Sequence, residues 1–457
     1  MGLSVIVLAA GEGRRMRSAR PKVLADLAGR PLLLHVLERA GALEPDRIRV
    51  VVGHQGDAVR AVLPRGVETV EQPHQRGTGD AVACALAEDL PPDDTALVLY
   101  GDVPLVQPDT LRTLVESGRR AQCGLLTARV ASPTGYGRIV RARDGSVERI
   151  VEERDASADE RAIDEINTGL LAMRTGDLAT CVAELDRDNA QGEYYLTDVI
   201  GRVRADGGRI DTVHPAFSWE IQGVNSRGQL AALERAWQHH LAELLLADGV
   251  TLRDPERIDV RGTVTAEPDA LIDIGCVFEG EVHLGAGVEI GAHCVVRNST
   301  LGANTRIQPH SVIEDARIGA DCQIGPFARM RPGCVLEQGA KVGNFVETKN
   351  TSVGRGSKIN HLAYVGDATL GDGVNVGAGV ITCNYDGRRK HRTVIEDGAF
   401  IGSDCQLVAP VTVGRGATIG AGSTITQDAP AEQLTLSRAR QQSVPGWRHP
   451  ADREEDD

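Results

Sequence analysis

Aromatic residues are scarce in this chain: they make up 3% of its 457 residues, whereas glycine accounts for 52 of them. This pairing predicts that part of the interior is too narrow for aromatic rings. The chain also lacks any run of 18 or more apolar residues, so we expect no membrane-spanning helix. No basic leader precedes the first apolar run, which enters a glycine motif rather than a cleavage site, so we expect no secretory signal.

Positive charge is also in deficit, with 50 basic residues against 64 acidic ones and a formal net charge of −14. This balance disfavours nucleic-acid binding through a broad basic face, but it allows a local basic pocket for phosphates. The nine cysteines include no C-x-x-C pair, so the sequence signals neither a zinc site nor a disulfide framework. A reducing cytoplasm fits this cysteine usage best.

The first two segments of the chain differ in the spacing of their apolar residues. Residues 1–225 alternate apolar stretches such as SVIVLAA and TALVLYGD with helical patterns such as PLLLHVLERAGAL, which predicts an α/β domain with a parallel, doubly wound sheet. Residues 226–250 carry Leu230, Leu233, Leu241 and Leu244 at helical spacing, which predicts an amphipathic linker helix.

From residue 251 on, the third segment (251–457) shows a sequence repeat with a period of six residues. An aliphatic residue returns at nearly every sixth position, often followed by glycine, as in Ile290-Gly291 and Ile324-Gly325. Such a repeat predicts a parallel β-helix with three hexads in each coil and the aliphatic side chains pointing inward. A small residue precedes the aliphatic one by two positions, and we interpret five cysteines in this place as small apolar residues in tight corners. They are Cys276, Cys294, Cys322, Cys334 and Cys405.

The repeat breaks once and then ends. Between Thr382 and Ile395 the inserted stretch reads CNYDGRRKHRTV, and insertions at the corners of such coils tend to carry function. Past about residue 427 the phase is lost, and the acidic ADREEDD predicts a disordered end to a C-terminal tail.

The first apolar strand runs directly into AAGEGRRM. A Gly-x-Gly after a strand can turn sharply and present successive backbone N–H groups to phosphate oxygens, and Arg15 and Lys22 add positive charge nearby. These residues therefore indicate a phosphate-binding loop; the alternative is that the Gly-x-Gly only forms a turn and binds no ligand. The dinucleotide-binding fingerprint requires a third glycine where Met16 stands, and the Walker pattern is absent.

The order of motifs resembles a known family. LAAGEGRRM with PKVL is similar to the signature of sugar-phosphate nucleotidyltransferases, and GTG at 77–79, YGD at 100–102 and GEYYLTD at 192–198 follow in the same order. With FARMRPG, GNFVETKN, HLAYVGD and ITCNYDG in the repeat, residues 3–448 resemble the bacterial bifunctional N-acetylglucosamine-1-phosphate uridyltransferase/glucosamine-1-phosphate N-acetyltransferases. The resemblance implies a Rossmann-like nucleotidyltransferase sheet and a left-handed β-helix.

The same resemblance implies the partners and the reaction. UTP and acetyl-CoA would be co-substrates, Mg²⁺ would serve the uridyltransferase site, and the product would be UDP-N-acetylglucosamine, a precursor of peptidoglycan and lipopolysaccharide. Partners would be small molecules rather than nucleic acid or a membrane, and the chain would form a homotrimer through its β-helix in the cytoplasm.

Nucleotidyl transfer joins two anions, so the protein must neutralise charge and hold both groups in line. Mg²⁺ favours oxygen ligands, and the carboxylate of Asp102, at the end of a predicted strand, is a candidate ligand. The alternative is that Asp102 only forms the turn after this strand. The resemblance adds Asn225 as the second metal ligand and makes Arg15 and Lys22 catalytic. It implies nucleotide contacts at Leu8, Ala9, Gly11, Lys22, Gln72, Gly77, Thr78, Tyr100 and Gly101. It implies sugar contacts at Gly137, Glu152, Asn167 and Asn225.

Three residues depart from the family pattern. Glu12 stands where small or basic residues are frequent, Arg14 where Thr or Ser is usual, and Asp80 where His is common. Arg14 could compete with Arg15 for phosphate, which leaves the individual roles in this loop open.

Acetyl transfer from acetyl-CoA to an amine requires a neutral amine and a general base. Histidine is the usual base near neutral pH, and His361 lies outside the aliphatic and small-residue positions of the repeat. The resemblance makes His361 this base. It implies sugar-phosphate contacts at Arg331, Lys349, Tyr364 and Asn375, with Lys390 near the substrate. It implies contacts to acetyl-CoA at Ala378, Asn384, Tyr385, Ser403, Ala421 and Arg438.

Two alternatives remain at this point. The β-helix could only assemble or regulate a sugar-phosphate nucleotidyltransferase, or the whole chain could be a non-enzymatic scaffold. The length of the coil, the NYDG insertion and His361 favour two catalytic sites.

Overall fold

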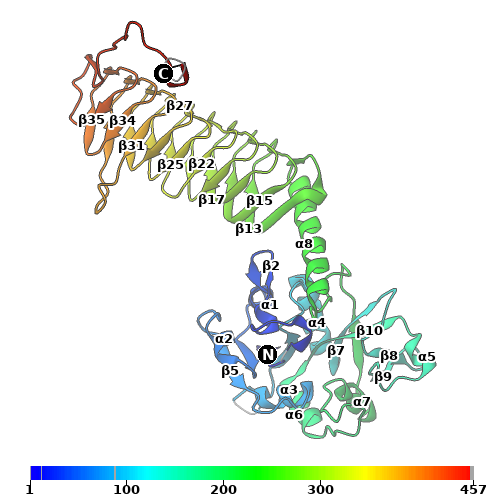
Figure 1. The fold of residues 1–457 in the computed structure, drawn as a ribbon. Coiled ribbons are helices and arrows are strands. Elements are labelled where there is room, and N and C mark those ends of the chain that lie inside the picture. Colours follow the sequence, from blue (N-terminus) through cyan, green and yellow to red (C-terminus); the bar gives the residue numbers. More distant parts are fainter. Residues whose placement is uncertain (1, 12, 87–88, 453–457) are drawn as a thin grey trace. The chain divides into compact units, whose positions relative to one another are not determined.

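The structure, a computed structural model, describes residues 2–11, 13–86 and 89–452. It divides into two compact units, residues 1–238 and 239–457, and the division falls inside helix α8 (Arg227–Ala247). Figure 1 shows a sheet flanked by helices in the first unit and a coil of short strands in the second. None of the helices in the described residues is long and apolar enough to cross a membrane.

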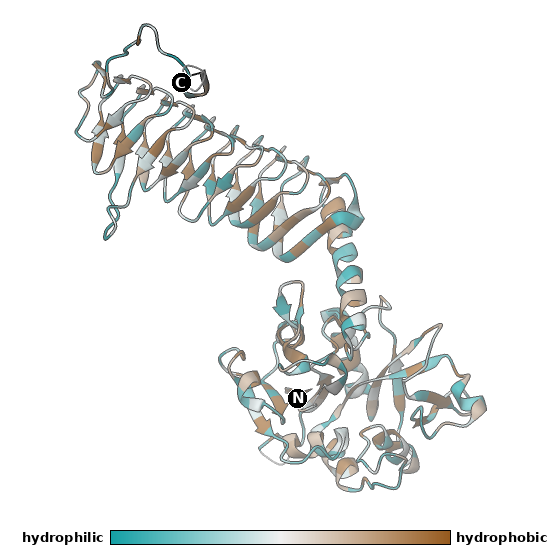
Figure 2. Cartoon of the chain, in the orientation of Figure 1, coloured by the Kyte–Doolittle hydropathy of each residue, from teal (hydrophilic) through white to brown (hydrophobic). Residues whose placement is uncertain are grey.

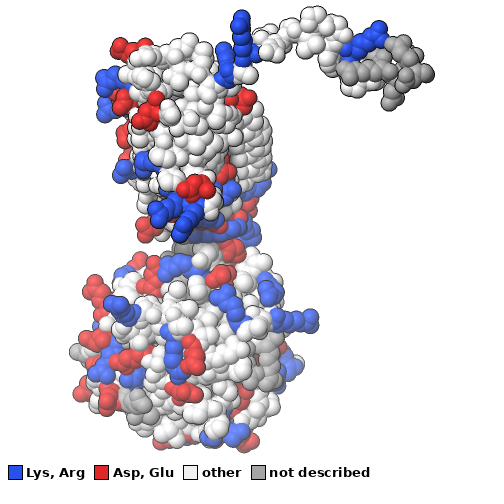
Figure 3. Space-filling model, turned by 60° about the vertical axis from the view of Figure 1, so that its left-hand side comes forward, with Lys and Arg blue, Asp and Glu red and all other residues white. Residues whose placement is uncertain are grey.

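Hydropathy and charge are distributed as expected for two separately folded units. Figure 2 shows hydrophobic residues gathered on the strands of both units and hydrophilic residues on the connecting loops. On the face drawn in Figure 3, acidic and basic side chains are interspersed rather than gathered into a broad basic area.

The first unit is built on a nine-stranded sheet with the order β11-β7-β10-β6-β1-β4-β5, and β8 and β9 are added beside β10. Its strands are β1 (Leu3–Leu8), β4 (Arg47–Val52), β5 (Glu68–Glu71), β6 (Thr95–Tyr100), β7 (Cys123–Arg129), β8 (Arg138–Arg141), β9 (Val147–Val151), β10 (Glu165–Arg174) and β11 (Ile210–Val213). A separate hairpin joins β2 (Asp26–Leu27) to β3 (Arg30–Pro31).

Helices cover both faces of this sheet. They are α1 (Leu32–Gly41), α2 (Gly56–Arg60), α3 (Thr78–Leu86), α4 (Pro108–Arg120), α5 (Ala158–Arg161), α6 (Thr175–Ala183) and α7 (Asp198–Ala205), with short 3₁₀ turns η1 (Arg14–Met16) and η2 (Lys22–Leu24). Successive residues of β1 alternate between two cores: Val5 and Val7 pack with α1 and α4, whereas Ile6 and Leu8 pack with α3, α6 and α7. The period of two along an extended strand produces this three-layer arrangement.

The sheet is parallel in β11-β7 and in β6-β1-β4-β5, as the sequence predicts, but it also contains antiparallel strands that the sequence did not predict. Strand β10 runs antiparallel to both β6 and β7, and β8 and β9 form an antiparallel pair at its side. A register shift between Asn167 and Leu171 interrupts the pairing of β10 with β7. An apolar run in the sequence predicts a buried strand but carries no information about its direction.

The second unit is a parallel β-helix, as the repeat predicts. It follows the η3 turn (Pro255–Arg257) and consists of β12 (Thr251–Leu252), β13 (Ile258–Ala266), β14 (Leu271–Ile272), β15 (Cys276–Leu284), β16 (Glu289–Ile290), β17 (Val295–Leu301), β18 (Arg306–Ile307), β19 (Val312–Glu314), β20 (Arg317–Ile318), β21 (Gln323–Ile324), β22 (Arg329–Met330), β23 (Val335–Leu336), β24 (Lys341–Asn344), β25 (Glu347–Lys349) and β26 (Ser352–Val353). It continues through β27 (Lys358–His361), β28 (Tyr364–Gly366), β29 (Ala368–Leu370), β30 (Asn375–Val376), β31 (Ile381–Cys383), β32 (Thr393–Ile395), β33 (Phe400–Ile401), β34 (Gln406–Val408), β35 (Val411–Val413), β36 (Thr418–Ile419), β37 (Thr424–Ile425) and β38 (Leu434–Thr435).

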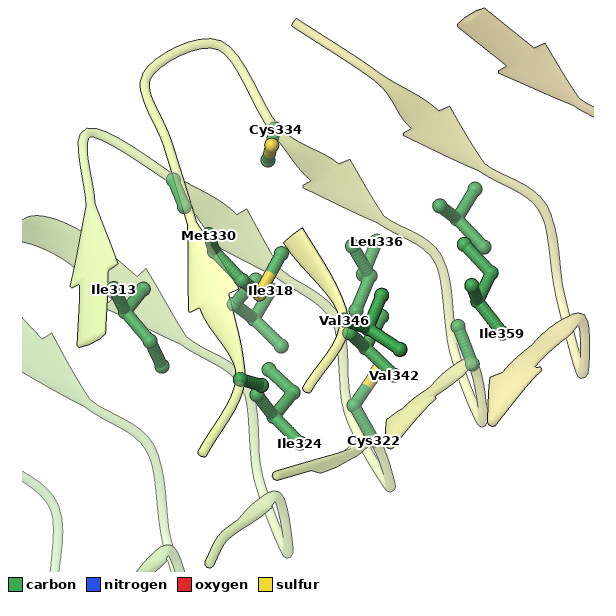
Figure 4. Packing of buried hydrophobic residues seen from close by; sticks show 14 of the residues in the cluster. Ile313, Ile318, Cys322, Ile324, Met330, Cys334, Leu336, Val342, Val346 and Ile359 are labelled. Atoms are coloured by element: carbon green, nitrogen blue, oxygen red, sulfur yellow. The ribbon is translucent and has the colours of Figure 1, made fainter. Parts of the chain in front are cut away.

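The coil has three faces. One is the 11-stranded sheet from β12 to β38; the other two are joined into a 16-stranded sheet, because β13, β15 and β17 bend from one face into the next. The aliphatic positions of the repeat point into the coil, and Figure 4 shows Ile318, Ile324, Leu336 and Val342 among them. Every one of the five small-position cysteines is buried, and burial raises the pKa of Cys276 to about 12. The hexad register is therefore confirmed.

Aromatic rings are placed mainly outside this coil. His293, His310, Phe327 and Phe345 occupy one corner in successive coils, each with positive φ, and their rings stack with centroids 4.9–5.3 Å apart. Phe278 is the exception to the predicted narrow interior, since it is 1% exposed in the core of an early coil.

The coil extends beyond the predicted limit at about residue 427. Ala429 bridges to Val413, and β38 pairs with β36, which adds a further partial coil. From Arg438 the chain leaves the coil, and a short η4 turn follows (Pro450–Asp452). Residues 453–457, predicted to be disordered, lie outside the described residues.

Candidate active sites

A cavity of about 280 Å³ opens at the C-terminal ends of β1 and β6. Because β1 and β6 are parallel and Leu8 pairs with Tyr100, the loops that follow them meet at the same edge of the sheet. All the predicted nucleotide contacts except Gly101 line this cavity, as does Asp102. Gly101 instead donates its N–H to Leu8 O at 2.9 Å and lies between the two strand ends.

The ammonium group of Lys22 joins the two predicted metal ligands. It donates to Asp102 Oδ2 and, over 3.0 Å, to Asn225 Oδ1. The side chains of Lys22 and Asp102 are only 13% and 16% exposed, so this charged cluster is largely shielded from water. A carboxylate oxygen and an amide oxygen thus converge on one cationic position, which is a donor set that Mg²⁺ accepts.

The GTG segment (77–79) packs closely against the GEYYLTD segment (192–198). Gly77 has φ of +118°, and a Cβ at this position would lie 2.4 Å from Tyr194 O. Gly79 N donates to Tyr194 O over 2.8 Å, and Leu196 N donates to Thr78 Oγ1 over 3.1 Å. Only glycine fits position 77, and the contact holds the wall of the cavity in place.

Gln72 lies at the end of β5 with its side chain buried. Its Nε2 donates to Asp80 Oδ2 over 2.7 Å and to Gly77 O over 3.1 Å. Asp80, which departs from the family pattern, therefore contacts a predicted nucleotide residue directly.

The predicted sugar contacts form a second group in this unit. Asn167 N donates to Gly137 O over 2.8 Å, and a Cβ on Gly137 would lie 3.3 Å from Glu152 Oε1. Glu152 also accepts from Thr197 Oγ1 over 3.2 Å, and burial raises the pKa of its carboxyl. Asn225 is not part of this group, since it lies with Lys22 and Asp102.

Some predicted residues lie outside these groups, and some residues that line the cavity were not predicted from the sequence. Arg15 is exposed in η1 and does not line the cavity in the described structure. Glu12 lies outside the described residues, as does the side chain of Arg14. Gln75 and Glu193 line the cavity although the sequence did not single them out. Glu193 belongs to the GEYYLTD motif, which was the available signal.

In the β-helix, four of the six residues predicted for the coenzyme lie one above another at one corner. Gly379 N donates to Leu362 O (3.2 Å), Asp404 N to Ala378 O (2.7 Å), Gly422 N to Ser403 O (2.8 Å) and Arg438 Nη1 to Ala421 O (2.8 Å). His361, Ala378, Ser403, Ala421 and Arg438 thus form a continuous column, called the corner column below. Its middle members are alanine and serine, and an arginine lies at its end.

His361 lies at the N-terminal end of the corner column. Its Nδ1 is 2.7 Å from Oδ1 of Asn344, which occupies the same register position one coil earlier. Because an amide oxygen only accepts, this contact selects the tautomer of the neutral ring that has its proton on Nδ1 and its lone pair on Nε2. Asn344 was not singled out from the sequence, although it lies in the quoted GNFVETKN motif.

Cationic groups gather on the neighbouring face. Arg331 N donates to Thr348 O over 2.9 Å, which brings Arg331 beside Lys349, and the nearby Lys390 ammonium lowers the pKa of Lys349. Asn384 Nδ2 donates to Asp367 Oδ2 over 2.5 Å and contacts Tyr364 OH over 3.4 Å. This cationic cluster can attract a phosphate group.

The structure separates some of the residues predicted for the coenzyme. Asn384 lies with the cationic cluster, and Tyr385, which is 60% exposed, bridges to Lys390 in the inserted loop. Asn375, which was predicted for the sugar phosphate, lies on the 11-stranded face that also carries His361, where it pairs with Lys358 and Phe400. Within the described residues, no hydrogen bond or ion pair connects His361 to Lys349 or Tyr364.

Similarities to known families agree with this organisation. Residues 5–247 match the family described as the MobA-like NTP transferase domain, and residues 392–427 match the bacterial transferase hexapeptide (six repeats). Residues 260–346 match the GMPPB C-terminal domain. As a class, the chain is an NTP transferase domain joined to a hexapeptide-repeat transferase domain.

Whole-length relatives narrow this class. The chain is 56% identical to "Bifunctional protein GlmU" of Ralstonia nicotianae, over 99% of this chain and 100% of that protein. It is 56% identical to the protein of the same name from Cupriavidus pinatubonensis, over 98% and 99%. The chain belongs to the family of bifunctional GlmU proteins. A crystal structure of UDP-glucose pyrophosphorylase complexed with UDP-glucose is 16% identical, with a TM-score of 0.42 over 52% of this chain and 98% of that one.

Proposed function

We propose that this chain makes UDP-N-acetylglucosamine in two group transfers, one in each unit. As a member of the GlmU family, the chain is a bifunctional uridyltransferase and acetyltransferase. The β-helix unit acetylates glucosamine-1-phosphate with acetyl-CoA. The N-terminal unit then transfers UMP from UTP to N-acetylglucosamine-1-phosphate and releases pyrophosphate. The proposed functional limits are residues 1–225 for uridyl transfer, 226–250 for the linker and 251–457 for acetyl transfer.

The Lys22–Asp102–Asn225 cluster is the observation that carries the first reaction. A phosphate oxygen of the sugar phosphate attacks the α-phosphorus of UTP, and the bond to the β-phosphate breaks. Lys22 supplies fixed positive charge at the cavity where the transferring phosphoryl group would lie. Arg15 would add charge to the phosphates from outside the cavity wall, and Gly137, Glu152 and Asn167 would hold the amino sugar.

Mg²⁺ fits the same cluster. Asp102 and Asn225 would hold it, and when bound it would neutralise the charge of the phosphates. The described residues contain no group of three or more His, Cys, Asp or Glu that could hold a metal ion. A site with two protein oxygens therefore leaves further ligand positions to substrate phosphates.

The His361–Asn344 pair supports the second reaction. The amine of glucosamine-1-phosphate attacks the thioester carbonyl, a C–N bond forms, the C–S bond breaks, and coenzyme A leaves as the thiol. His361 Nε2, with its lone pair free, would accept the amine proton. The cationic cluster of Arg331, Lys349 and Lys390 would bind the sugar phosphate. The corner column would line the pantetheine arm and end with Arg438 near coenzyme phosphates.

Assembly and location belong to the same proposal. We propose a homotrimer formed through the β-helix and a cytoplasmic location. The exposed apolar side chains on the coil, among them Phe345 and Leu362, support burial against other copies.

One incubation tests the reaction sequence. The full chain is incubated with glucosamine-1-phosphate, acetyl-CoA, UTP and Mg²⁺, and the products are identified by mass. We expect UDP-N-acetylglucosamine, only the N-acetylated sugar phosphate when UTP is omitted, and no UDP-N-acetylglucosamine when acetyl-CoA is omitted. Absence of free thiol from acetyl-CoA would instead favour a β-helix that only regulates or assembles a nucleotidyltransferase.

A further inference from the structure

We propose that Asp80 makes the first cavity selective for uracil over cytosine by fixing the amide orientation of Gln72. Asp80 is a positioning residue, because it acts through Gln72 rather than through contact with the nucleotide. The inference rests on the proposed uridyl transfer and assigns its base selectivity to a pair of side chains.

The hydrogen bonds of Gln72 determine which way its amide faces. Its NH₂ group lies 2.7 Å from Asp80 Oδ2 and 3.1 Å from Gly77 O. An ionised carboxylate and a backbone carbonyl only accept hydrogen bonds, so only the NH₂ end of the amide can face them. Asp80 is in the first turn of α3. Both amide hydrogens are therefore engaged.

The opposite end of the amide is left for the ligand. Gln72 lines the cavity and is 4% exposed, and within the described part of the chain no donor reaches its Oε1. An amide oxygen that lines a cavity and has no protein donor can accept a hydrogen bond from a ligand that brings an N–H group. The cavity thus presents an acceptor at a fixed position.

Uracil and cytosine differ at the atom that such an acceptor would meet. In a uridine nucleotide the base has one N–H donor, at N3, because N1 carries the ribose. In a cytidine nucleotide N3 is a lone-pair acceptor. A cytosine bound in the position of uracil, with N3 toward Gln72, would set this lone pair against those of Oε1, and its N4 amino group would lie at the place of uracil O4. If the amide could rotate by half a turn, its NH₂ group would pair with cytosine N3 instead. Asp80 and Gly77 O oppose that rotation, because turning the oxygen toward them would place acceptors in contact. Loss of Asp80 removes the shorter of the two bonds and leaves only the 3.1 Å bond to Gly77 O.

The test compares base selectivity in variants of the full chain. Pyrophosphate release is measured with N-acetylglucosamine-1-phosphate and Mg²⁺, and kcat/KM is determined for UTP and for CTP. Asp80→Ala is expected to lower the UTP-to-CTP ratio of kcat/KM by about twofold to tenfold, mainly through KM, which is the range that one net hydrogen bond corresponds to. Asp80→Asn is expected to restore most of the ratio, because its amide oxygen can accept the same bond.

Two controls separate positioning from general damage. The ratio of UTP to 5-methyluridine triphosphate should not change in Asp80→Ala, because both bases carry N3–H. Glu71→Ala removes a neighbouring carboxylate that is 65% exposed and pairs with Arg60, and it should leave both ratios unchanged. Thermal unfolding shows whether each variant is folded.

The outcomes are distinct. If Asp80→Ala is folded and keeps the UTP-to-CTP ratio of the parent, the inference is wrong and the proposed uridyl transfer stands. If the parent itself releases no pyrophosphate from UTP, the proposed function fails first. Should Asp80→Ala not fold, Asp80→Leu replaces it, because leucine is of similar size and accepts no hydrogen bond: a lowered UTP-to-CTP ratio supports the inference, and a ratio equal to the parent's overturns it.

Discussion

Replacing His361 by alanine should separate the two activities of this chain. We expect acetyl transfer to fall by about 10²–10⁴-fold, the range typical for loss of a positioned general base. This corresponds to about 2.7–5.5 kcal/mol of activation free energy. Uridyl transfer should be unchanged, because its residues lie in the other compact unit.

The structure indicates that this substitution leaves the fold intact. His361 is exposed, lies outside the core positions of the coil, and makes its one side-chain hydrogen bond with Asn344. Surface substitutions of this kind usually change the free energy of unfolding by no more than about 0.5 kcal/mol. The loss of rate should therefore be a loss of chemistry, with kcat reduced far more than KM for glucosamine-1-phosphate.

Both activities are measured on the same preparation, as thiol release from acetyl-CoA and pyrophosphate release from UTP. His283→Ala is the matched control, because His283 is another exposed histidine of the coil whose ring contacts Thr265. Asn344→Ala should give a smaller loss than His361→Ala, since the base remains but its tautomer is no longer fixed. Equal loss of both activities in His361→Ala, or acetyl transfer at the parent rate, would refute the reasoning.

Three further predictions follow from the same structure. Asp102→Ala, or removal of divalent metal with a chelator, should reduce pyrophosphate release by at least about 10²-fold and spare thiol release; loss of thiol release as well would contradict a metal site confined to the first unit. Gly77→Ala should lower the stability of the first unit by about 1–3 kcal/mol and raise the KM for UTP, because its Cβ would lie 2.4 Å from Tyr194 O; calorimetry and UTP kinetics measure both, and parent-like values would show that this contact can relax. Alkylation of the folded protein followed by peptide mass analysis should modify only Cys84 and Cys383, the two cysteines that are not fully buried, and early labelling of any other cysteine would indicate an opened coil.

The local pattern of the sequence predicted much of the candidate sites. Asp102 was expected at a sheet edge because it follows a buried strand, and it lies there beside Lys22. The register of the hexads placed Ile324 and Cys322 inside the coil and His361 outside it, as observed. Each of these predictions depends on a short hydrophobic repeat or on the end of a strand. Both features can be recognised from residues that are close together in the sequence.

Contacts between distant segments could not be predicted in this way. The direction of β10 depends on which strands flank it, and an apolar run looks the same in either direction. The six-residue repeat cannot be recognised in the sequence beyond residue 427, but β38 still pairs with β36 in the structure. Phe278 fits inside the coil although the composition predicted too little room.

The sequence by itself determined which residues face inward, where strands end, and that one unit would be a sheet with helices and the other a coil. These properties depend on periodicity and local backbone preference. Only the tertiary structure decided that Lys22 meets Asp102 and Asn225, that Asp80 holds the amide of Gln72, and that Asn344 holds His361. Such contacts depend on strand order, loop path and register between coils, and these are settled by the packing of the whole unit rather than by any short stretch of chain.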